Sequence, residues 1–283
     1  MERNGIPRPF LKWAGGKSQI LPELLSRVPS DFGAYHEPFL GGGALFFALM
    51  RRGILRDKKV FLSDSNPELI NAFLVIRDNP EELLELLRGY QRRNTREEYY
   101  RIRAENPISP TERAARLIYL NRTCYNGLYR VNSRGEFNVP YGRYKNPRIY
   151  DPDNIRAVSE ALKGVEVLCE DFEAVLSRAE PGDFVYLDPP YYPLSRTASF
   201  SDYTLDGFSE EDHIRLARTF AELAKRGVLV MESNSDTDFV RSYYRGWRLT
   251  QIKAKRPINS KGEGRGPVGE LIIMNYSKRG RNA

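Results

Sequence analysis

Residues 33–50, which read GAYHEPFLGGGALFFALM, carry the pattern that decides the fold. The first part predicts a short strand that ends at residues 37–39, and three consecutive glycines, residues 41–43, follow it closely. The apolar stretch from Ala44 to Met50 then predicts a helix. A strand that runs through a glycine loop into a helix is typical of the start of a parallel sheet with crossover helices.

The same pattern continues after this stretch. A second strand is predicted from Val60 to Ser63, with Asp64 at its end and Pro67 in the first turn of the next helix. Two later apolar runs, residues 165–168 and 184–187, have the composition of buried strands. We therefore predict a Rossmann-like α/β fold, with helices on both faces of the sheet.

The last third of the chain adds a helix and further strands. Ser209 followed three residues later by Asp212 forms the signature of a capping box, so a helix is expected to begin there and to end at Gly227. A strand is predicted over residues 228–232, and strand patterns flank a loop over residues 257–267 that is rich in glycine and basic residues.

The segment from Ile70 to Tyr150 has a different character. Residues 81–120 are helical and rich in arginine, and residues 121–150 are polar and aromatic, with a hairpin turn predicted at residues 133–136. We predict that residues 70–150 form an inserted, mainly helical domain with a β-hairpin. Residues 1–69 and 151–283 would form the α/β domain.

The positive charge is concentrated in this insertion. The chain of 283 residues has a formal net charge of +7, and residues 88–148 contain 14 basic and 5 acidic side chains. A local excess of this size indicates a surface that binds a polyanion such as a nucleic acid. A solvated, arginine-rich helical surface would give the same count, and the charge alone favours neither interpretation.

Several protein classes do not fit the composition. Two cysteines and two histidines argue against a disulfide framework and against a metal site, so no metal is expected. No apolar run is long enough to span a bilayer, and the first residues have no apolar core of a signal peptide. We expect a cytoplasmic protein that binds no membrane.

The strongest candidate for a catalytic motif is Asp188-Pro189-Pro190-Tyr191, which directly follows the predicted strand 184–187. Ligands bind at the carboxyl ends of strands in open α/β sheets. The prolines cannot continue the strand, and their carbonyls stay available as acceptors. A carboxylate, a free carbonyl and an aromatic ring together suit an extruded adenine, whose exocyclic amine would donate to Asp188 and Pro189 while Tyr191 stacks on the base. A strand-ending turn with an incidental acid is the structural alternative.

The chain resembles the DNA adenine methyltransferase (Dam) family over nearly its whole length, because seven motifs occur in the order that the family shows. They are residues 10–17 (FLKWAGGK), 37–43 (EPFLGGG), 63–66 (SDSN), 125–130 (YNGLYR), 134–140 (RGEFNVP), 171–172 (DF) and 188–191 (DPPY). Each glycine-rich piece alone would be a weak signal, whereas the ordered set is specific.

The resemblance implies S-adenosylmethionine as the cofactor. The residues that match the family's cofactor contacts are Trp13, Lys17, Phe39, Gly41, Gly43, Asp64, Asp171, Phe172 and Asp188. The glycines at 41 and 43 would let the backbone approach the ligand closely. Asp64 would bind the ribose hydroxyls, as acids at this position do in other dinucleotide folds.

The remaining cofactor contacts follow from the same resemblance. Asp171 and Phe172 match the pair that holds the adenine ring, and Trp13 and Lys17 match the residues at the methionine end. Aromatic faces and carboxylates are favourable near a cationic sulfonium. Each assignment has a structural alternative, such as a helix cap for Asp64 and a core position for Phe172.

The insertion and Lys12 would read double-stranded DNA. The residues that match the family's DNA contacts are Lys12, Tyr125, Asn126, Leu128, Arg130 and Pro140. Arg130 can form a fork onto guanine O6 and N7, Leu128 and Pro140 suit a thymine methyl, and Lys12 matches a lysine that contacts a second guanine. Tyr125 and Asn126 match residues that insert where the base leaves, and GATC is the target that the family implies.

Ser195 belongs to a loop after the catalytic motif that would contact the backbone of the target strand. Taken together, these features predict a monomeric adenine-N6 DNA methyltransferase.

Four other functions share single features with this sequence. Residues 16–18 resemble the end of a phosphate-binding loop, but Leu11 stands where that motif needs glycine and no strand precedes it, so an NTPase is rejected. A cytosine-N4 enzyme more often has serine where this chain has Asp188. An RNA substrate is disfavoured by the motif at residues 125–130, which suits the major groove of a DNA duplex. A DNA-binding regulator without activity is the remaining alternative.

Overall fold

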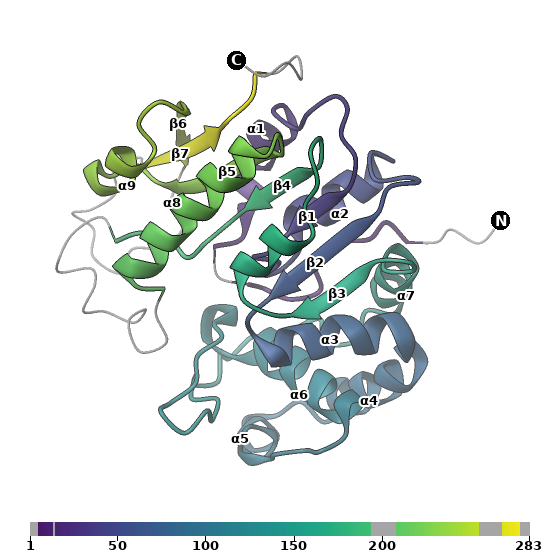
Figure 1. Cartoon of the computed structure of the whole chain (residues 1–283). Helices are drawn as coiled ribbons and strands as arrows, with labels where there is room; N and C mark the ends of the chain where they lie inside the picture. The colour runs from purple at the N-terminus through teal and green to yellow at the C-terminus, as the bar shows by residue number, and fades with distance from the viewer. Residues whose placement is uncertain (1–4, 14, 194–207, 255–267, 278–283) are drawn as a thin grey trace. The chain divides into compact units, whose positions relative to one another are not determined.

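The computed structural model describes residues 5–13, 15–193, 208–254 and 268–277. Within these residues the strands form one seven-stranded sheet, in the order β3-β2-β1-β4-β5-β7-β6 (Figure 1). The strands are β1 (Tyr35–Glu37), β2 (Val60–Asp64), β3 (Glu166–Cys169), β4 (Phe184–Leu187), β5 (Leu229–Ser235), β6 (Arg248–Ala254) and β7 (Val268–Met274). The predicted α/β fold is confirmed.

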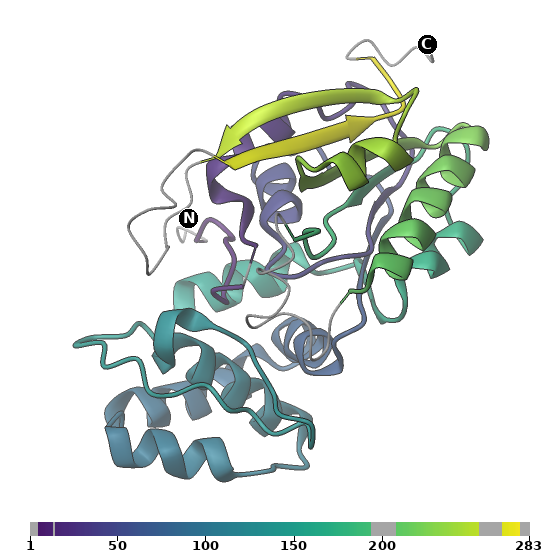
Figure 2. The ribbon, with the colours of Figure 1, turned by 90° about the vertical axis from the view of Figure 1, so that its left-hand side faces the viewer.

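The centre of the sheet is parallel and one edge is antiparallel. Strand β1 pairs in parallel with β2 and with β4, and β4 pairs in parallel with β5. Strand β7 runs antiparallel to β5 and to β6, and Figure 2 shows β6 and β7 side by side. Because β1, β2, β4 and β5 run in the same direction, their carboxyl ends share one edge, where ligands bind in this class of sheet.

The α-helices are α1 (Leu21–Leu25), α2 (Ala44–Arg51), α3 (Pro67–Asp78), α4 (Pro80–Arg92), α5 (Arg96–Ala104), α6 (Pro110–Thr123), α7 (Pro152–Ala161), α8 (Glu210–Lys225) and α9 (Asp238–Tyr243). Side-chain caps start α3, α5, α8 and α9, and a proline lies in the first two positions of α1, α3, α4, α6 and α7. Short 3-10 turns are η1 (Lys17–Gln19), η2 (Tyr125–Gly127) and η3 (Phe172–Ser177). The predicted capping box is confirmed, because Ser209 and Asp212 bond to each other's backbone at the start of α8.

The predicted strand boundaries lie close to the observed ones, except at the end of β5. The strand predicted over residues 228–232 continues to Ser235, because the three polar residues that follow Glu232 are buried in β5. A polar run usually marks the end of a strand, and for this reason the predicted strand stops at Glu232. The hairpin turn at residues 133–136 is confirmed by an antiparallel bridge between Val131 and Phe137.

The chain forms two compact units. Unit 1 consists of Met1–Gly16, Gly41–Arg56 and Asp64–Cys169, and unit 2 consists of Lys17–Leu40, Asp57–Ser63 and Glu170–Ala283. In unit 1, α6 packs against α3, α4 and α5. Its fully buried side chains include Phe73, Tyr99 and Tyr119.

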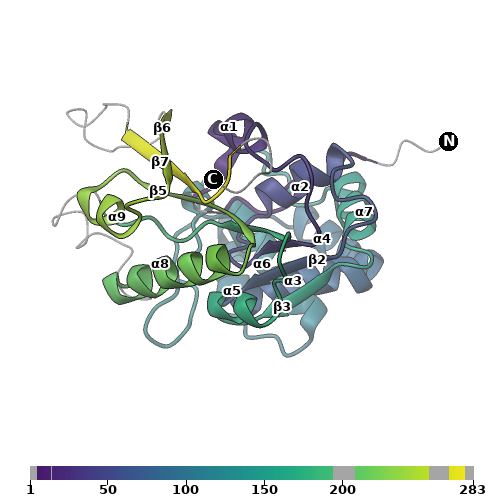
Figure 3. The same ribbon diagram turned by 45° about the horizontal axis from the view of Figure 1, so that its top comes forward.

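Unit 2 has its own core between the sheet and α8. Leu216, Phe220 and Leu223 of α8 pack with Val185, Val230 and other residues of the strands. Figure 3 shows α8 running alongside this part of the sheet. Burial of apolar surface contributes about 25 cal/mol per Å², so this core stabilises the part of the sheet that contains β4 and β5.

Candidate active site

Asp188 follows β4 directly, and two polar groups hold its carboxylate. Lys17 Nζ lies 2.7 Å from Asp188 Oδ1, and Ser233 Oγ donates to the same oxygen at 2.8 Å. The side chains of Lys17 and Asp188 are only 7% and 18% exposed, so this ion pair is largely shielded from solvent. Burial raises the pKa of Asp188, and the charge and hydrogen bond of Lys17, followed by the hydrogen bond of Ser233, oppose that rise.

Tyr191 lies against the same ion pair. Lys17 Nζ is 4.5 Å from the centre of the Tyr191 ring, which is a favourable cation–π distance. The Tyr191 hydroxyl donates to Glu270 Oε2 at 2.9 Å, and burial raises the pKa of this tyrosine. Pro189 is buried and Pro190 is exposed. The structure therefore brings Lys17, Asp188 and Tyr191 together within unit 2.

A second group of predicted residues gathers at η3. The Phe39 and Phe172 rings stack with centres 5.2 Å apart, and Phe208 packs against both. Arg215 of α8 lies 4.8 Å from the centre of the Phe172 ring and donates to Asp171 Oδ1 at 2.9 Å. Phe172 is 5% exposed and belongs to the core of unit 2. Arg215 thus positions the Asp171 carboxylate.

The glycine loop and Asp64 form a third group, in unit 1. Gly41 N donates to Asp64 Oδ2 at 3.0 Å, and Asn66 N donates to Asp64 Oδ1 at 3.0 Å. Burial raises the pKa of Asp64, and these two backbone donors oppose the rise. Each carboxylate oxygen can accept a further hydrogen bond, so the bonds leave capacity for a ligand hydroxyl.

The loop conformation depends on glycine. Gly41 has φ +47°, and a Cβ there would lie 3.0 Å from Trp13 Cδ1. Gly43 has φ +66° at the start of α2. The alternative role of Asp64 as a helix cap is wrong, because the side chain of Asn66 caps α3.

Lys12 is tied to the turn at η2. Asn121, which is fully buried, accepts from Lys12 N at 2.7 Å and donates to Lys12 O at 2.8 Å and to Gly127 O at 2.9 Å. A Cβ at Gly127 would lie 2.6 Å from Lys12 Cβ, so only glycine permits this approach. The Lys12 ammonium lies 4.5 Å from the centre of the Tyr144 ring.

The predicted inserting residues lie on an exposed turn. Tyr125 is 53% exposed, and Asn126 has φ +55°, a left-handed conformation that asparagine tolerates better than most residues. Tyr125 N donates to Pro140 O at 2.8 Å, and Leu128 N donates to Tyr125 O at 3.3 Å. Tyr125, Asn126, Leu128 and Pro140 are therefore neighbours in unit 1.

Arg130 lies on the hairpin that follows. Its Nε donates to Asn138 Oδ1 at 2.7 Å, and Asn138 N donates to Arg130 O at 3.0 Å. The Arg130 side chain is exposed. Asn138 thus orients the guanidinium group at the surface, where the sequence predicts that it meets a base.

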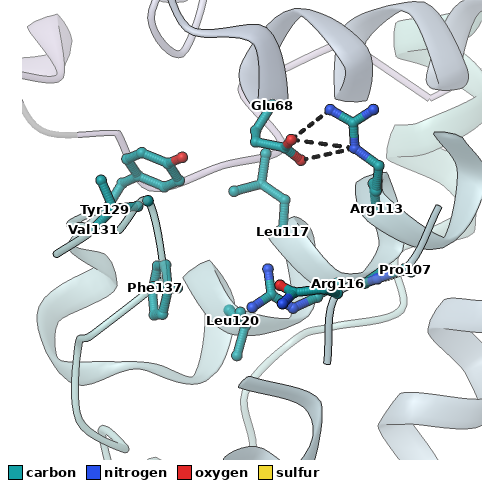
Figure 4. A pocket seen from close by; sticks show the side chains of 11 residues that line it. Glu68, Pro107, Arg113, Arg116, Leu117, Leu120, Tyr129, Val131 and Phe137 are labelled. Atoms are coloured by element: carbon teal, nitrogen blue, oxygen red, sulfur yellow. Dashed lines mark hydrogen bonds and ion pairs between the residues drawn. The ribbon is translucent and has the colours of Figure 1, made fainter. Parts of the chain in front are cut away.

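A small pocket lies beside this hairpin in unit 1 (Figure 4). Tyr129 and Phe137 line one side, and Arg113, which pairs with Glu68, lines another. Arg116 donates to the carbonyls of Ile102 and Arg103 at 3.0 and 2.6 Å. The pocket contains none of the predicted cofactor contacts, and its arginines serve to hold the helices together.

Ser195 lies outside the described residues, as does the basic loop at residues 257–267. Across the described part of the chain, no cluster of three or more His, Cys, Asp or Glu side chains could hold a metal ion. No helix in that part is long and apolar enough to cross a membrane.

Sequence reasoning missed several residues that hold the predicted ones. They are Asn121, Asn138, Arg215, Ser233 and Glu270. Asn138 lies in the motif at residues 134–140 that supports the family resemblance, so the sequence could have indicated a role for it. The others act through tertiary contacts between segments far apart in the chain, and no local pattern marks them.

The fold and the held carboxylate define a class, the α/β enzymes whose chemistry takes place at the carboxyl edge of a parallel sheet. The family model described as "D12 class N6 adenine-specific DNA methyltransferase" matches residues 13–258. The chain belongs to this family and is a site-specific, adenine-specific DNA methyltransferase.

Curated relatives support this membership over the full length. A protein of Lactococcus lactis subsp. cremoris named type II methyltransferase M1.LlaDCHI is 45% identical, with 98% of each chain covered. The type II methyltransferase M.MjaIII of Methanocaldococcus jannaschii is 44% identical, with 95% of this chain and 99% of that protein covered. A DNA adenine methylase of Escherichia coli K12 is 36% identical, with coverages of 94% and 95%.

Proposed function

We propose that this enzyme transfers a methyl group from S-adenosylmethionine to N6 of an adenine in double-stranded DNA, within GATC, after the base has left the helix. The observation that carries the proposal is the Asp188 carboxylate, held by Lys17 and Ser233 beside the Tyr191 ring. Such a fixed acceptor next to an aromatic face suits an extruded purine that carries an exocyclic amine.

The chemistry follows from the electronic structure of that amine. Its lone pair is delocalised into the adenine ring, so the nitrogen is a weak nucleophile. Hydrogen bonds from the NH2 group to Asp188 and to the Pro189 carbonyl would favour a tetrahedral nitrogen with a localised lone pair. Tyr191 would stack on the base and keep the nitrogen aligned. Positioning and shielded electrostatics would supply most of the rate enhancement.

The proposed cofactor contacts are Trp13, Lys17, Phe39, Gly41, Gly43, Asp64, Asp171, Phe172 and Asp188. Their chemistry fits the ligand, since Asp64 keeps acceptor capacity for hydroxyl groups and Gly41 leaves the space that a Cβ would fill. Aromatic rings at 39 and 172 suit an adenine moiety. When bound, the cofactor would supply an electrophilic methyl group on a sulfonium. As the N–C bond forms, the S–C bond to the methyl group breaks and leaves a neutral thioether, and the methylated nitrogen loses one proton to solvent.

Lys17 has a further role in this proposal. The resemblance assigns it to the methionine end of the cofactor, and its ammonium also contacts Asp188. Its positive charge opposes the rise in the pKa of Asp188 that burial causes. Lys17 would therefore keep that carboxylate ionised and able to accept hydrogen bonds from the amine.

We propose that Lys12, Tyr125, Asn126, Leu128, Arg130 and Pro140 contact the DNA, together with Ser195 in the loop after the catalytic motif. Arg130, oriented by Asn138, would read guanine. In this proposal residues 70–150 form the recognition domain, residues 1–69 and 151–283 form the catalytic domain, and the protein acts as a monomer. The type II names of two relatives favour a role in restriction–modification.

Sequencing of methylated DNA tests this function. Purified protein would be incubated with S-adenosylmethionine and a mixed-sequence duplex, and modified bases would be mapped by single-molecule sequencing. We expect N6-methyladenine confined to GATC. Methylated cytosine, or N6-methyladenine at an unrelated sequence, would contradict the proposed substrate or target. Tight DNA binding without any transfer would favour the inactive-regulator alternative.

A further inference from the structure

Three consecutive polar residues, Ser233, Asn234 and Ser235, form the carboxyl end of β5 and are almost fully buried, at 0%, 1% and 2% exposure. Buried polar side chains destabilise a fold unless they are hydrogen-bonded. All three make hydrogen bonds to residues 188–192, which we call the catalytic segment. The polar end of β5 therefore binds the catalytic segment through side-chain hydrogen bonds.

Ser233 fixes the carboxylate. The parallel register pairs Leu187 of β4 with Glu232 of β5, and the next residues of the two strands are Asp188 and Ser233. Ser233 Oγ lies 2.8 Å from Asp188 Oδ1 and 3.0 Å from the Tyr186 hydroxyl. An ionised carboxylate can only accept, so Ser233 donates to Asp188 and the Tyr186 hydroxyl donates to Ser233.

Asn234 and Ser235 fix the backbone two residues past the catalytic prolines. Tyr192 N donates to Asn234 Oδ1 at 3.4 Å, and Ser235 Oγ donates to Tyr192 O at 2.7 Å. Asn234 in turn donates to Glu232 Oε1 at 3.0 Å, which fixes its own orientation. Both polar groups of the Tyr192 main chain are thus bound by β5.

Glu270 of β7 fixes the ring of Tyr191. The antiparallel register places Glu270 opposite Ser235, and its Oε2 accepts from the Tyr191 hydroxyl at 2.9 Å. Lys17 Nζ contacts the same ring 4.5 Å from its centre. The ring is therefore held at its hydroxyl by Glu270 and at its face by Lys17.

We propose that Ser233 and Glu270 are positioning residues of the methyl transfer. Ser233 aims the Asp188 carboxylate at the target amine, and Glu270 sets the plane in which Tyr191 stacks on the base. Neither residue lies in the motifs that define the cofactor and DNA contacts. This inference rests on the proposed function, in which Asp188 and Tyr191 act on an extruded adenine.

Ser233→Ala tests the first half, with Ser159→Ala as the matched control. Ser159 is a buried serine of α7 whose hydroxyl donates to Arg77 O at 3.2 Å. We expect about a tenfold lower single-turnover rate for Ser233→Ala, as for other hydrogen bonds to a charged group, and less than about a twofold change for the control. Cofactor affinity, measured by calorimetry, should match the wild type in both variants.

The pH dependence separates positioning from a loss of stability. Loss of the Ser233 donor removes one interaction that favours ionised Asp188, so the acid limb of the rate profile should move to higher pH in Ser233→Ala only. Among the described residues, the ionisable groups that interact electrostatically with Asp188 are Lys17, Tyr35, Tyr186, Tyr191 and Glu232. They are the same in wild type and in both serine variants.

A double-mutant cycle tests the second half. Glu270→Ala should slow single turnover by about tenfold, the size expected for loss of one hydrogen bond to a carboxylate, and Tyr191→Phe, which keeps the ring, should have a similar effect. If Glu270 acts through the Tyr191 hydroxyl, Glu270→Ala adds less than about twofold in the Tyr191→Phe background. Fully multiplicative effects would overturn the role of Glu270.

Asp188→Ala separates this inference from the proposed function. If Asp188→Ala is inactive while Ser233→Ala matches Ser159→Ala in rate and pH profile, the role of Ser233 is overturned and the proposed function stands. If Asp188→Ala turns over like the wild type, the assigned chemistry fails, and the positioning role of Ser233 and Glu270 fails with it.

Discussion

The catalytic segment, residues 188–192, and the reader segment, which we define as residues 125–140, are built in different ways. The catalytic segment is bound by Lys17, by the buried end of β5 and by Glu270. The reader segment exposes Tyr125 and Arg130, and its side-chain bonds are mostly short-range, such as that between Arg130 and Asn138.

This difference has a physical reason. Groups that polarise a reacting nitrogen are most effective when they are fixed and shielded before the substrate binds, because no reorganisation is then needed during the reaction. Groups that read base edges must stay accessible, and exposed side chains take their final positions on the DNA. We therefore expect changes in the catalytic segment to alter the rate at every site, and changes in the reader segment to alter the choice of site.

The largest effect is expected for Asp188→Ala. Loss of the carboxylate removes the fixed acceptor for the amine, and single-turnover methylation should fall by at least about 100-fold, as when one preorganised group is removed from other active sites. Cofactor affinity, measured by calorimetry, should fall by a far smaller factor, because Asp188 is only one of the proposed cofactor contacts. Turnover close to that of the wild type would contradict the assigned chemistry.

A pH-dependent stability change is expected for Glu232→Gln. Burial raises the pKa of Glu232 from 4.5 to about 7, although Tyr244 and Asn234 bond to the carboxyl. A carboxyl with a raised pKa in the folded state stabilises the protein below its ordinary pKa, and this contribution is lost as the pH rises through about 7. Between pH 5 and pH 8 the free energy of unfolding should therefore fall by about 2–3 kcal/mol more in the wild type than in Glu232→Gln.

Denaturant titrations of both proteins at the two pH values measure this difference. Glu270→Gln is a suitable control, because its carboxyl is only partly buried. Equal pH dependence of the unfolding free energy in wild type and Glu232→Gln would contradict the raised pKa of Glu232. The end of β5 that binds the catalytic segment would then be more accessible to water than its burial indicates.

A smaller effect, on specificity, is expected for Arg130→Ala. Removal of a bidentate contact to guanine costs about 1–3 kcal/mol of discrimination at one position of the target. Methylation of duplexes altered at that guanine should rise relative to the intact target, while the maximal rate changes little. Unchanged discrimination at every position would show that Arg130 is not the reader.

The smallest effect is expected for Asn138→Ala. Asn138 bonds to Arg130 Nε at an exposed position, and such a bond contributes about 0.5–1.5 kcal/mol. Discrimination at the guanine that we propose Arg130 reads should weaken by about threefold, and at no other position. A loss as large as that of Arg130→Ala would indicate that the hairpin itself has changed.

The sequence predicted the parts of the molecule that local patterns determine. The apolar runs at 60–63 and 184–187 identified two strands, and the capping box at Ser209 located a helix start. The motif at 188–191 could be placed at the carboxyl end of a strand because the residues before it are apolar. The family could also be inferred, because seven motifs follow one another in order.

The support of the catalytic segment could not be predicted in this way. Ser233 follows an apolar strand and reads as its polar end, and its role depends on the register between β4 and β5. Glu270 is 79 residues from Tyr191 in the chain and meets it through the pairing of β5 with β7. Contacts of this kind are properties of the assembled sheet, and no single segment of the sequence carries them.

The division between rate and choice of site is tested most directly by one ratio, the single-turnover rate on a GATC duplex divided by that on a duplex altered at one guanine. For Tyr191→Ala we expect both rates to fall by a similar factor, so that the ratio stays at its wild-type value. For Arg130→Ala we expect the ratio to approach one while the rate on GATC is largely retained. A ratio that changes in Tyr191→Ala and stays constant in Arg130→Ala would contradict the assignment of chemistry to one segment and recognition to the other.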